Sequence, residues 1–160
     1  LSRGLGDVYK RQVLRRALEG LEVVWVLGNH DPVPPEGLPG TACAEWAEGP
    51  FLFRHQALPA LPRSGSVEIS GHFHPKATMP TRAGGVTRPC FVADPRRVIL
   101  PSFGAYTGGL DLRDPALAGL FRRGGRAFLL GRDRLFSMPV TPHGAAERVA
   151  PPEKRLISAP

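Results

Sequence analysis

The sequence predicts a single α/β domain built mainly from short strands. The chain has 160 residues, of which 42% are hydrophobic and 22% are charged, so it can form one buried core but has little room for two. Short β-branched and aromatic runs alternate with turns rich in Pro and Gly, whereas only two stretches have apolar residues at helical spacing. This composition excludes a disordered polyelectrolyte.

The elements can be placed in order along the chain. Residues 13–21 have helical spacing, and residues 22–27 (EVVWVL) read as a buried strand that ends at Gly28. Residues 31–40 contain too much Pro and Gly for a regular element. The remaining expected elements are strands at 51–55 and 67–71, a hairpin pairing 90–93 with 96–100, a short helix at 115–121, and a hairpin pairing 126–130 with 134–138. Trp25 and Phe128 are the expected core aromatics.

Cysteine content and charge exclude several classes of protein. Cys43 and Cys90 are the two cysteines and neither stands in a CxxC motif, so a disulfide framework and a thiolate zinc finger are excluded. We expect both to be small buried residues in a protein of the reducing cytoplasm. No apolar run approaches the roughly 18 to 20 residues of a membrane span. The formal net charge of +7 is compatible with an anionic partner.

The two ends of the chain are expected to lie outside the domain. Residues 2–12 read SRGLGDVYKRQ, and codons for this run can spell a transposase-type sequencing adapter. We therefore interpret residues 1–12 as a non-native scar and expect a native portion to be missing before Val13. Residues 13–140 form the predicted domain. Residues 141–160 are rich in Pro, Ala and charge without periodicity, which predicts a disordered tail.

Four of the five histidines fall at the ends of predicted strands. His30 lies in the GNHD run after the first strand, His55 ends the second, and His72 and His74 in the GHFH run end the third. Side chains at i and i+2 of an extended segment point to the same side, so His72 and His74 can converge on one point. Neutral imidazole is a common ligand for Zn, Mn and Fe.

Simpler interpretations exist for each piece. An HxH motif is common by chance, a lone His55 can be a surface histidine, and Asn29 and Asp31 can bond to their own backbone in a turn. The ordered set of strand-GNHD, strand-His and strand-GHxH is much harder to obtain by chance, and it favours a metal site. An Asn side-chain oxygen suits the harder transition metals, and Gly28 and Gly71 would permit the turns that expose such ligands.

In these residues the sequence resembles the calcineurin-like metallophosphoesterases, whose motifs run DxH, GDxxD, GNH[DE], His and GHxH. The last three blocks match in order, and the first two are not present. A narrower resemblance, to the bacterial ligase-associated DNA-damage-response metallophosphoesterase (an endonuclease), rests on RPCFVAD at 88–94 and LPSFGAYTGGLDLRDPA at 100–116. The implied fold is a four-layer α-β-β-α sandwich that lacks its first strands.

The resemblance implies a role for each matching residue. Asn29, His55 and His72 would bind one divalent ion of Mn, Fe or Zn, and His74 would bind a second. His30 would face the scissile phosphate, and Asp31 would orient His30 by accepting its second N–H. The two ions together would clamp an in-line phosphoryl displacement. Because the carboxylate blocks are not present, we expect the chain by itself to be inactive.

The resemblance also implies DNA as the substrate and association with a DNA ligase and a helicase or exonuclease of the same repair system. Arg82 and Arg88 flank the loop after GHFH and are the expected substrate-binding residues, since the guanidinium fork suits phosphate. Scattered Arg residues can equally be a solvated face of a GC-rich organism's protein. Two other functions stay open, namely a phosphatase or phosphodiesterase for small phosphoesters and a non-catalytic nucleic-acid-binding or scaffold domain.

Overall fold

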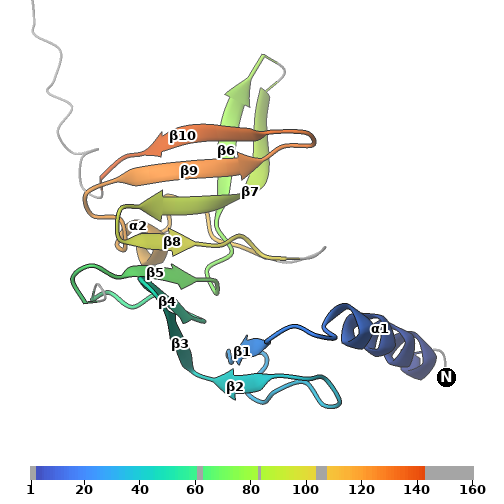
Figure 1. Cartoon of the computed structure of the whole chain (residues 1–160). Coiled ribbons are helices and arrows are strands. Elements are labelled where there is room, and N and C mark those ends of the chain that lie inside the picture. Colours follow the sequence, from blue (N-terminus) through green and yellow to red (C-terminus); the bar gives the residue numbers. More distant parts are fainter. Residues whose placement is uncertain (1–2, 61–62, 83, 104–107, 143–160) are drawn as a thin grey trace, which may run out of the picture.

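The computed structural model describes residues 3–60, 63–82, 84–103 and 108–142, and it shows a mixed α/β fold whose body is mostly sheet (Figure 1). The two helices are α1 (Arg3–Ala17) and α2 (Pro115–Ala118). The strands are β1 (Val24–Val26), β2 (Thr41–Cys43), β3 (Glu45–Glu48), β4 (Phe51–Arg54), β5 (Val67–Ser70), β6 (Lys76–Thr81), β7 (Gly84–Asp94), β8 (Arg97–Ile99), β9 (Gly125–Leu130) and β10 (Leu135–Val140).

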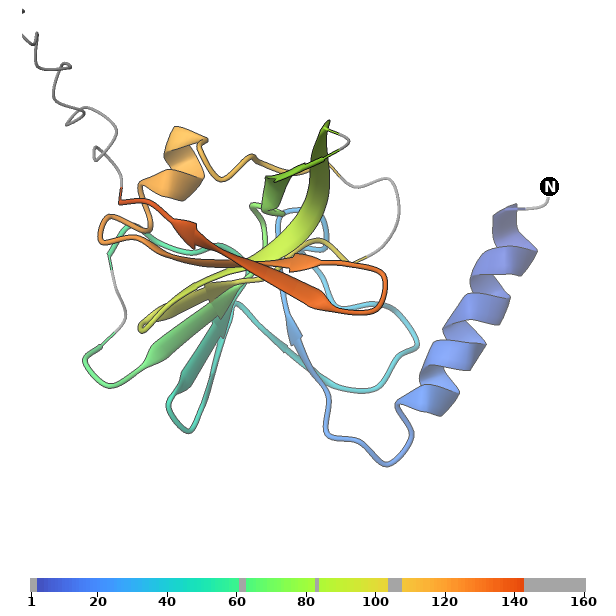
Figure 2. The ribbon, with the colours of Figure 1, turned by 90° about the horizontal axis from the view of Figure 1, so that it is seen from above.

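An eight-stranded sheet forms the body of the molecule. Its order is β10-β9-β7-β8-β5-β4-β3, and β6 pairs with β7 as an additional hairpin partner. The central strands β4, β5 and β8 run parallel to one another, and the other pairs are antiparallel. A separate two-stranded parallel sheet joins β1 to β2. The helix α1 stands apart from the large sheet in both views of the ribbon (Figures 1 and 2).

One face of the large sheet carries the buried core. Its strand residues Cys90, Val92, Ile99, Ala127 and Leu129 are at most 1% exposed. The segment around α2 covers this face with two further buried side chains, Leu117 and Phe121 (Figure 2). The alternation of these residues with more exposed neighbours follows the two-residue period of a strand.

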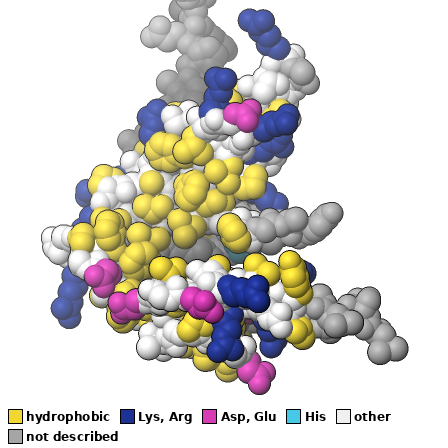
Figure 3. Space-filling view, turned by 45° about the vertical axis from the view of Figure 1, so that its right-hand side comes forward, with side chains coloured by type: hydrophobic (Ala, Val, Ile, Leu, Met, Phe, Trp, Pro, Cys, Tyr) yellow, Lys and Arg dark blue, Asp and Glu magenta, His cyan; other side chains and the backbone are white. Residues whose placement is uncertain are grey.

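The opposite face of the same sheet is also apolar but is only half-buried. Phe91 lies opposite Phe128 across the β7–β9 pair, and Val98 lies opposite Ile69 across the β8–β5 pair. All four are of intermediate exposure. Hydrophobic side chains gather over one face of the molecule in Figure 3. No described helix covers this second face. Its apolar residues are therefore less buried than the apolar residues on the face that α2 covers.

Most predicted elements are confirmed and three strands were missed. Both predicted hairpins form, as β7–β8 and β9–β10, and 31–40 contain no regular element. The missed strands are β2, β3 and β6. Trp25 and Phe128 are half-buried and therefore do not belong to the core, and Cys90 is buried whereas Cys43 is not.

Other predictions about domain organisation remain untested. The helix α1 runs through the expected boundary between the scar at 1–12 and the native chain. The expected tail lies almost wholly outside the described residues, since 143–160 are not among them. The arrangement of two sheets in four layers stays a prediction. Within the described ranges, no helix is both long enough and apolar enough to cross a membrane.

Candidate metal and phosphate site

Parallel pairing of two strands brings His55 and His72 together. The strands β4 and β5 are parallel neighbours whose last residues, Arg54 and Ser70, are register partners. The pairing continues one step further, because the Gly71 N–H donates to the carbonyl of His55 over 3.0 Å. Parallel strands end at the same edge of a sheet, so the residues that follow them emerge side by side.

The side chains of Asn29 and His72 both approach the Nε2 atom of His55, and we call these three residues the three-donor cluster. His55 Nε2 lies 2.6 Å from Asn29 Oδ1 and 3.1 Å from His72 Nδ1. The two imidazole rings are arranged edge to face, with centroids 5.0 Å apart. Asn29 comes from the loop after β1, so the cluster joins the small sheet to the large one.

The donor geometry of the three-donor cluster fits one divalent cation. A ring nitrogen can serve a single partner in the plane of its ring, yet His55 Nε2 lies close to two. Two ligands that are each about 2.1 Å from an ion and at right angles to one another lie about 3.0 Å apart, which matches the 3.1 Å between the two ring nitrogens, whereas the 2.6 Å from His55 Nε2 to Asn29 Oδ1 is a hydrogen-bond distance. The described residues contain no group of three or more His, Cys, Asp or Glu side chains able to hold a metal, and the third donor here is an amide.

The electrostatic surroundings keep His55 in the form that binds metals. Burial lowers the pKa of His55, and the neighbouring His72, His30 and His74 lower it further, while Asp31 raises it. A lowered pKa favours the neutral ring, which has a lone pair available for a cation.

Gly28 is required by the position of the His55 ring. A Cβ atom added at Gly28 would lie 2.5 Å from His55 Nδ1 and 2.7 Å from Cε1, well inside contact distance. The expected reason for this glycine was a sharp turn, but its φ is not positive. Gly71, for which the same reason was expected, also lacks a positive φ, and a Cβ there would meet only the His55 carbonyl at 3.8 Å.

The GHFH segment is not extended, which corrects the geometric reason given for its convergence. His72 has a φ of 63° and His74 a φ of 47°, both in the left-handed region. Between them Phe73 is buried, and its N–H donates to the Gly71 carbonyl over 2.7 Å. The two histidines still line one open pocket of about 550 Å³. The left-handed conformation of both residues, rather than alternation along a strand, accompanies their position at the same pocket.

The open pocket also receives His30 and the backbone of Gly108 and Gly109. A Cβ at Gly109 would lie 2.1 Å from the His74 carbonyl oxygen, so the chain passes too close for any side chain. Hydrogen bonds from Leu110 N–H to the Phe73 carbonyl and from Lys76 N–H to the Leu110 carbonyl fasten this strip to the GHFH segment. Residues 104–107 of the GAYTGG motif lie outside the described residues.

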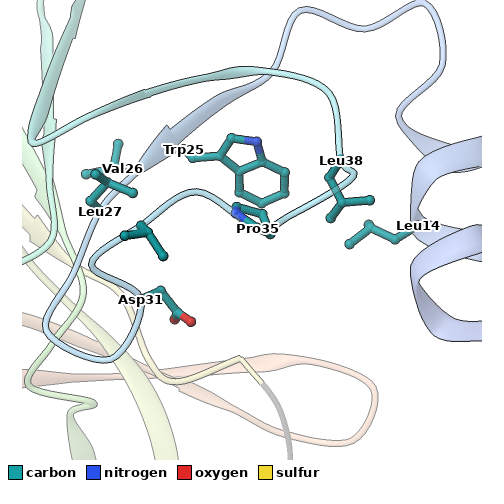
Figure 4. A pocket seen from close by; sticks show the side chains of 8 residues that line it. Leu14, Trp25, Val26, Leu27, Asp31, Pro35 and Leu38 are labelled. Atoms are coloured by element: carbon teal, nitrogen blue, oxygen red, sulfur yellow. The ribbon is translucent and has the colours of Figure 1, made fainter. Parts of the chain in front are cut away.

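His30 and Asp31 are both exposed, and the described hydrogen bonds include none between their side chains. The Asp31 carbonyl accepts the Gly28 N–H over 3.2 Å, which closes the turn after β1. The Asp31 side chain borders a second, apolar cavity of about 310 Å³ lined by Trp25, Leu38 and Leu14 of α1 (Figure 4). The expected orientation of His30 by Asp31 is therefore not made in this structure.

Arg82 and Arg88 lie on the β6–β7 hairpin, and both are exposed. Neither lines the open pocket. Arg88 donates to the carbonyl of its neighbour Thr87 over 3.4 Å. Sequence reasoning missed a buried ion pair between Glu68 and Arg97, because nothing local links two residues that are 29 positions apart.

No protein-family model matches the chain, and no curated protein matches it. Its structure is similar to the crystal structure of the nuclease MPE of Pseudomonas putida, with a TM-score of 0.63 and 28% sequence identity. The match covers 86% of this chain and 63% of the nuclease chain, so the chain spans less than two thirds of that protein's length. This similarity supports a nuclease or phosphoesterase fold, but it does not show the subfamily.

Proposed function

We propose that the chain is the metal-binding part of a metal-dependent phosphodiesterase that cleaves nucleic acid. The observation that carries the proposal is the three-donor cluster, in which two imidazoles and an amide oxygen converge on one point. The similarity to a nuclease over 86% of the chain supports the same reaction class. The resemblance to ligase-associated endonucleases supports a role in DNA repair, with DNA as the substrate.

Each residue of the site has its own role in this proposal. Asn29, His55 and His72 hold one ion of Mn, Fe or Zn, and His74 contributes to a second position at the open pocket. When bound, divalent ions supply Lewis-acid stabilisation of the phosphodiester oxygens. His30 lines the same pocket, from which it can donate a proton to the leaving oxygen.

The second position is incomplete within the described residues. The donors at the site are neutral, and Asp31, the neighbouring carboxylate, lies outside the three-donor cluster. Two dications a few ångströms apart repel strongly without carboxylates between them. The chain by itself is therefore expected to bind one ion and not to cleave DNA.

Nucleic-acid binding through the β6–β7 hairpin is tested by fluorescence anisotropy with a labelled single-stranded DNA. Replacing Arg82 and Arg88 with Ala removes two exposed cations, so affinity should fall and the salt dependence of binding should become shallower by about one to two units of slope. Arg132→Ala with Arg134→Ala, which also removes two exposed cations, between β9 and β10, is the matched control.

Metal content in the same samples separates the two parts of the proposal. The Arg variants should retain as much Mn²⁺ as the wild-type chain. Equal DNA affinity in the wild type and the Arg82/Arg88 variant would contradict the assignment of these residues. A wild-type chain that retains no Mn²⁺, Fe²⁺ or Zn²⁺ would contradict the metal-dependent function itself.

A further inference from the structure

A buried ion pair lies directly behind the strand ends that carry the site histidines. Glu68 on β5 and Arg97 on β8 are both 0% exposed, and Arg97 Nε lies 2.6 Å from Glu68 Oε2. Burying two charges carries a large desolvation cost, and apolar residues of similar volume often give equal or greater stability. Packing alone therefore does not account for this pair.

Several other contacts of the pair are made to the chain on both sides of His55. On the far side, Glu68 Oε1 accepts the Leu58 N–H over 3.2 Å and Arg97 Nη2 donates to the Leu58 carbonyl over 2.5 Å. On the near side, Arg54 Nε lies 3.5 Å from the same Glu68 oxygen. His55 thus lies between Leu58, whose N–H is hydrogen-bonded to this carboxylate, and Arg54, whose guanidinium lies within ion-pair distance of it without a hydrogen bond from Nε.

The Glu68 carboxylate also connects the segment that contains His55 to the strand that leads to His72. Glu68 belongs to β5, and two residues after it that strand leads through Ser70 into Gly71 and His72. The buried pair consequently connects the segment that carries one donor to the strand that presents the other. Arg97 extends the connection to the loop after α2 by donating to the Leu120 carbonyl over 3.2 Å.

We propose that Glu68 and Arg97 are positioning residues for His55, which fix its place in the three-donor cluster. They touch no metal or substrate, and they act through the backbone of Leu58 and the side chain of Arg54. The effect of this pair on metal binding rests on the proposed function, whereas its effect on the position of His55 does not.

The variant that tests the inference replaces both members of the pair, Glu68→Met with Arg97→Met. It removes the two charges together and keeps side chains of similar length, so the sheet should fold. The matched control is Leu129→Ala, which removes buried packing on β9, a strand separated from β4 by the three strands β7, β8 and β5. Circular dichroism establishes that each variant is folded.

Two measurements are made on the whole chain. Titration with Co²⁺ followed by visible absorption reports both affinity and coordination geometry. Hydrogen exchange of the Gly71 amide, which is bonded to the His55 carbonyl, reports the position of His55 without any metal. The double variant should bind Co²⁺ about 10-fold more weakly with an altered spectrum, and its Gly71 amide should exchange faster. Leu129→Ala should leave both signals unchanged.

The outcomes separate this inference from the proposed function. Gly71 exchange that is unchanged in the folded double variant overturns the positioning role, whether or not Co²⁺ binds. Faster exchange with unchanged Co²⁺ affinity and spectrum overturns its link to the metal site. A wild-type chain that binds no Co²⁺ contradicts the proposed function, and Gly71 exchange then decides the positioning role alone.

Discussion

The three-donor cluster and the open pocket, which share His72, are formed by different structural features. At the three-donor cluster, strand register, the left-handed conformation of His72 and the absence of a side chain at Gly28 bring donor atoms into direct contact. At the open pocket, His74, which is also left-handed, and His30 line a cavity of about 550 Å³ without a hydrogen bond between them among those described. The difference is that the first gathers donor atoms within hydrogen-bond distance of one ring nitrogen, whereas the second leaves an open space between its histidines.

Substitution of Gly28 should have the largest effect, because it disturbs the three-donor cluster directly. Gly28→Ala places a methyl group 2.5–2.8 Å from three atoms of the His55 ring, so the ring must leave the cluster. We expect metal affinity to fall by about 100-fold, the upper end of the effect of disturbing a ligand's support. Isothermal titration with Zn²⁺ measures the change.

Gly71→Ala is the control for this substitution, because its methyl group would make an ordinary contact of 3.8 Å with the His55 carbonyl. Its affinity should equal that of the wild type. Equal losses in the two variants would mean that any change near His55 disturbs the cluster, and the close approach at Gly28 would have no special role.

At the open pocket, Gly109→Ala should destabilise the chain by about 1–3 kcal/mol, the usual cost of overpacking. The added methyl would lie 2.1 Å from the His74 carbonyl, and a backbone atom cannot move aside as a flexible side chain can. The neighbouring variant Gly108→Ala meets no described atom within 4 Å and should change stability by less than about 0.5 kcal/mol. Urea unfolding of both variants gives the difference, and similar midpoints would refute the packing of this strip against His74.

The smallest expected effect concerns pH. Burial and neighbouring histidines lower the pKa of His55, so its contribution to stability is fully present above the unfolded value of 6.5. That contribution is lost as the pH falls through the lower folded pKa. Urea unfolding of the wild type and of His55→Gln between about pH 5 and 7.5 should therefore show a steeper loss of stability on acidification in the wild type. Parallel curves would contradict the neutral state of the half-buried His55.

The sequence could predict which residues carry the donor atoms, but not the backbone conformation that positions them. The GNHD and GHFH runs follow recognisable strands, which indicated that these blocks and His55 act together, and the family resemblance then grouped Asn29, His55 and His72 as one ligand set. The left-handed conformations of His72 and His74 could not be predicted, because non-glycine residues adopt this conformation in only a few per cent of cases, even though histidine does so more often than most.

Other features depended on contacts between distant segments. The strand β6 (KATMPT) contains Pro80 and lacks the alternation of a strand, and its pairing with β7 alone defines it. The apolarity of Phe128 predicted a core position, yet it lies on the sheet face that no described helix covers. Hydrophobicity alone does not reveal which of two faces is buried.

The central claim is that one cation binds at the three-donor cluster and that the open pocket does not hold a second in this chain. Equilibrium dialysis against Mn²⁺ and Zn²⁺, with metal content measured for the wild type, His55→Ala and His74→Ala, tests it most directly. The account predicts one ion per chain in the wild type and in His74→Ala, and none in His55→Ala. Two ions in the wild type, or equal metal loss in both variants, would contradict it.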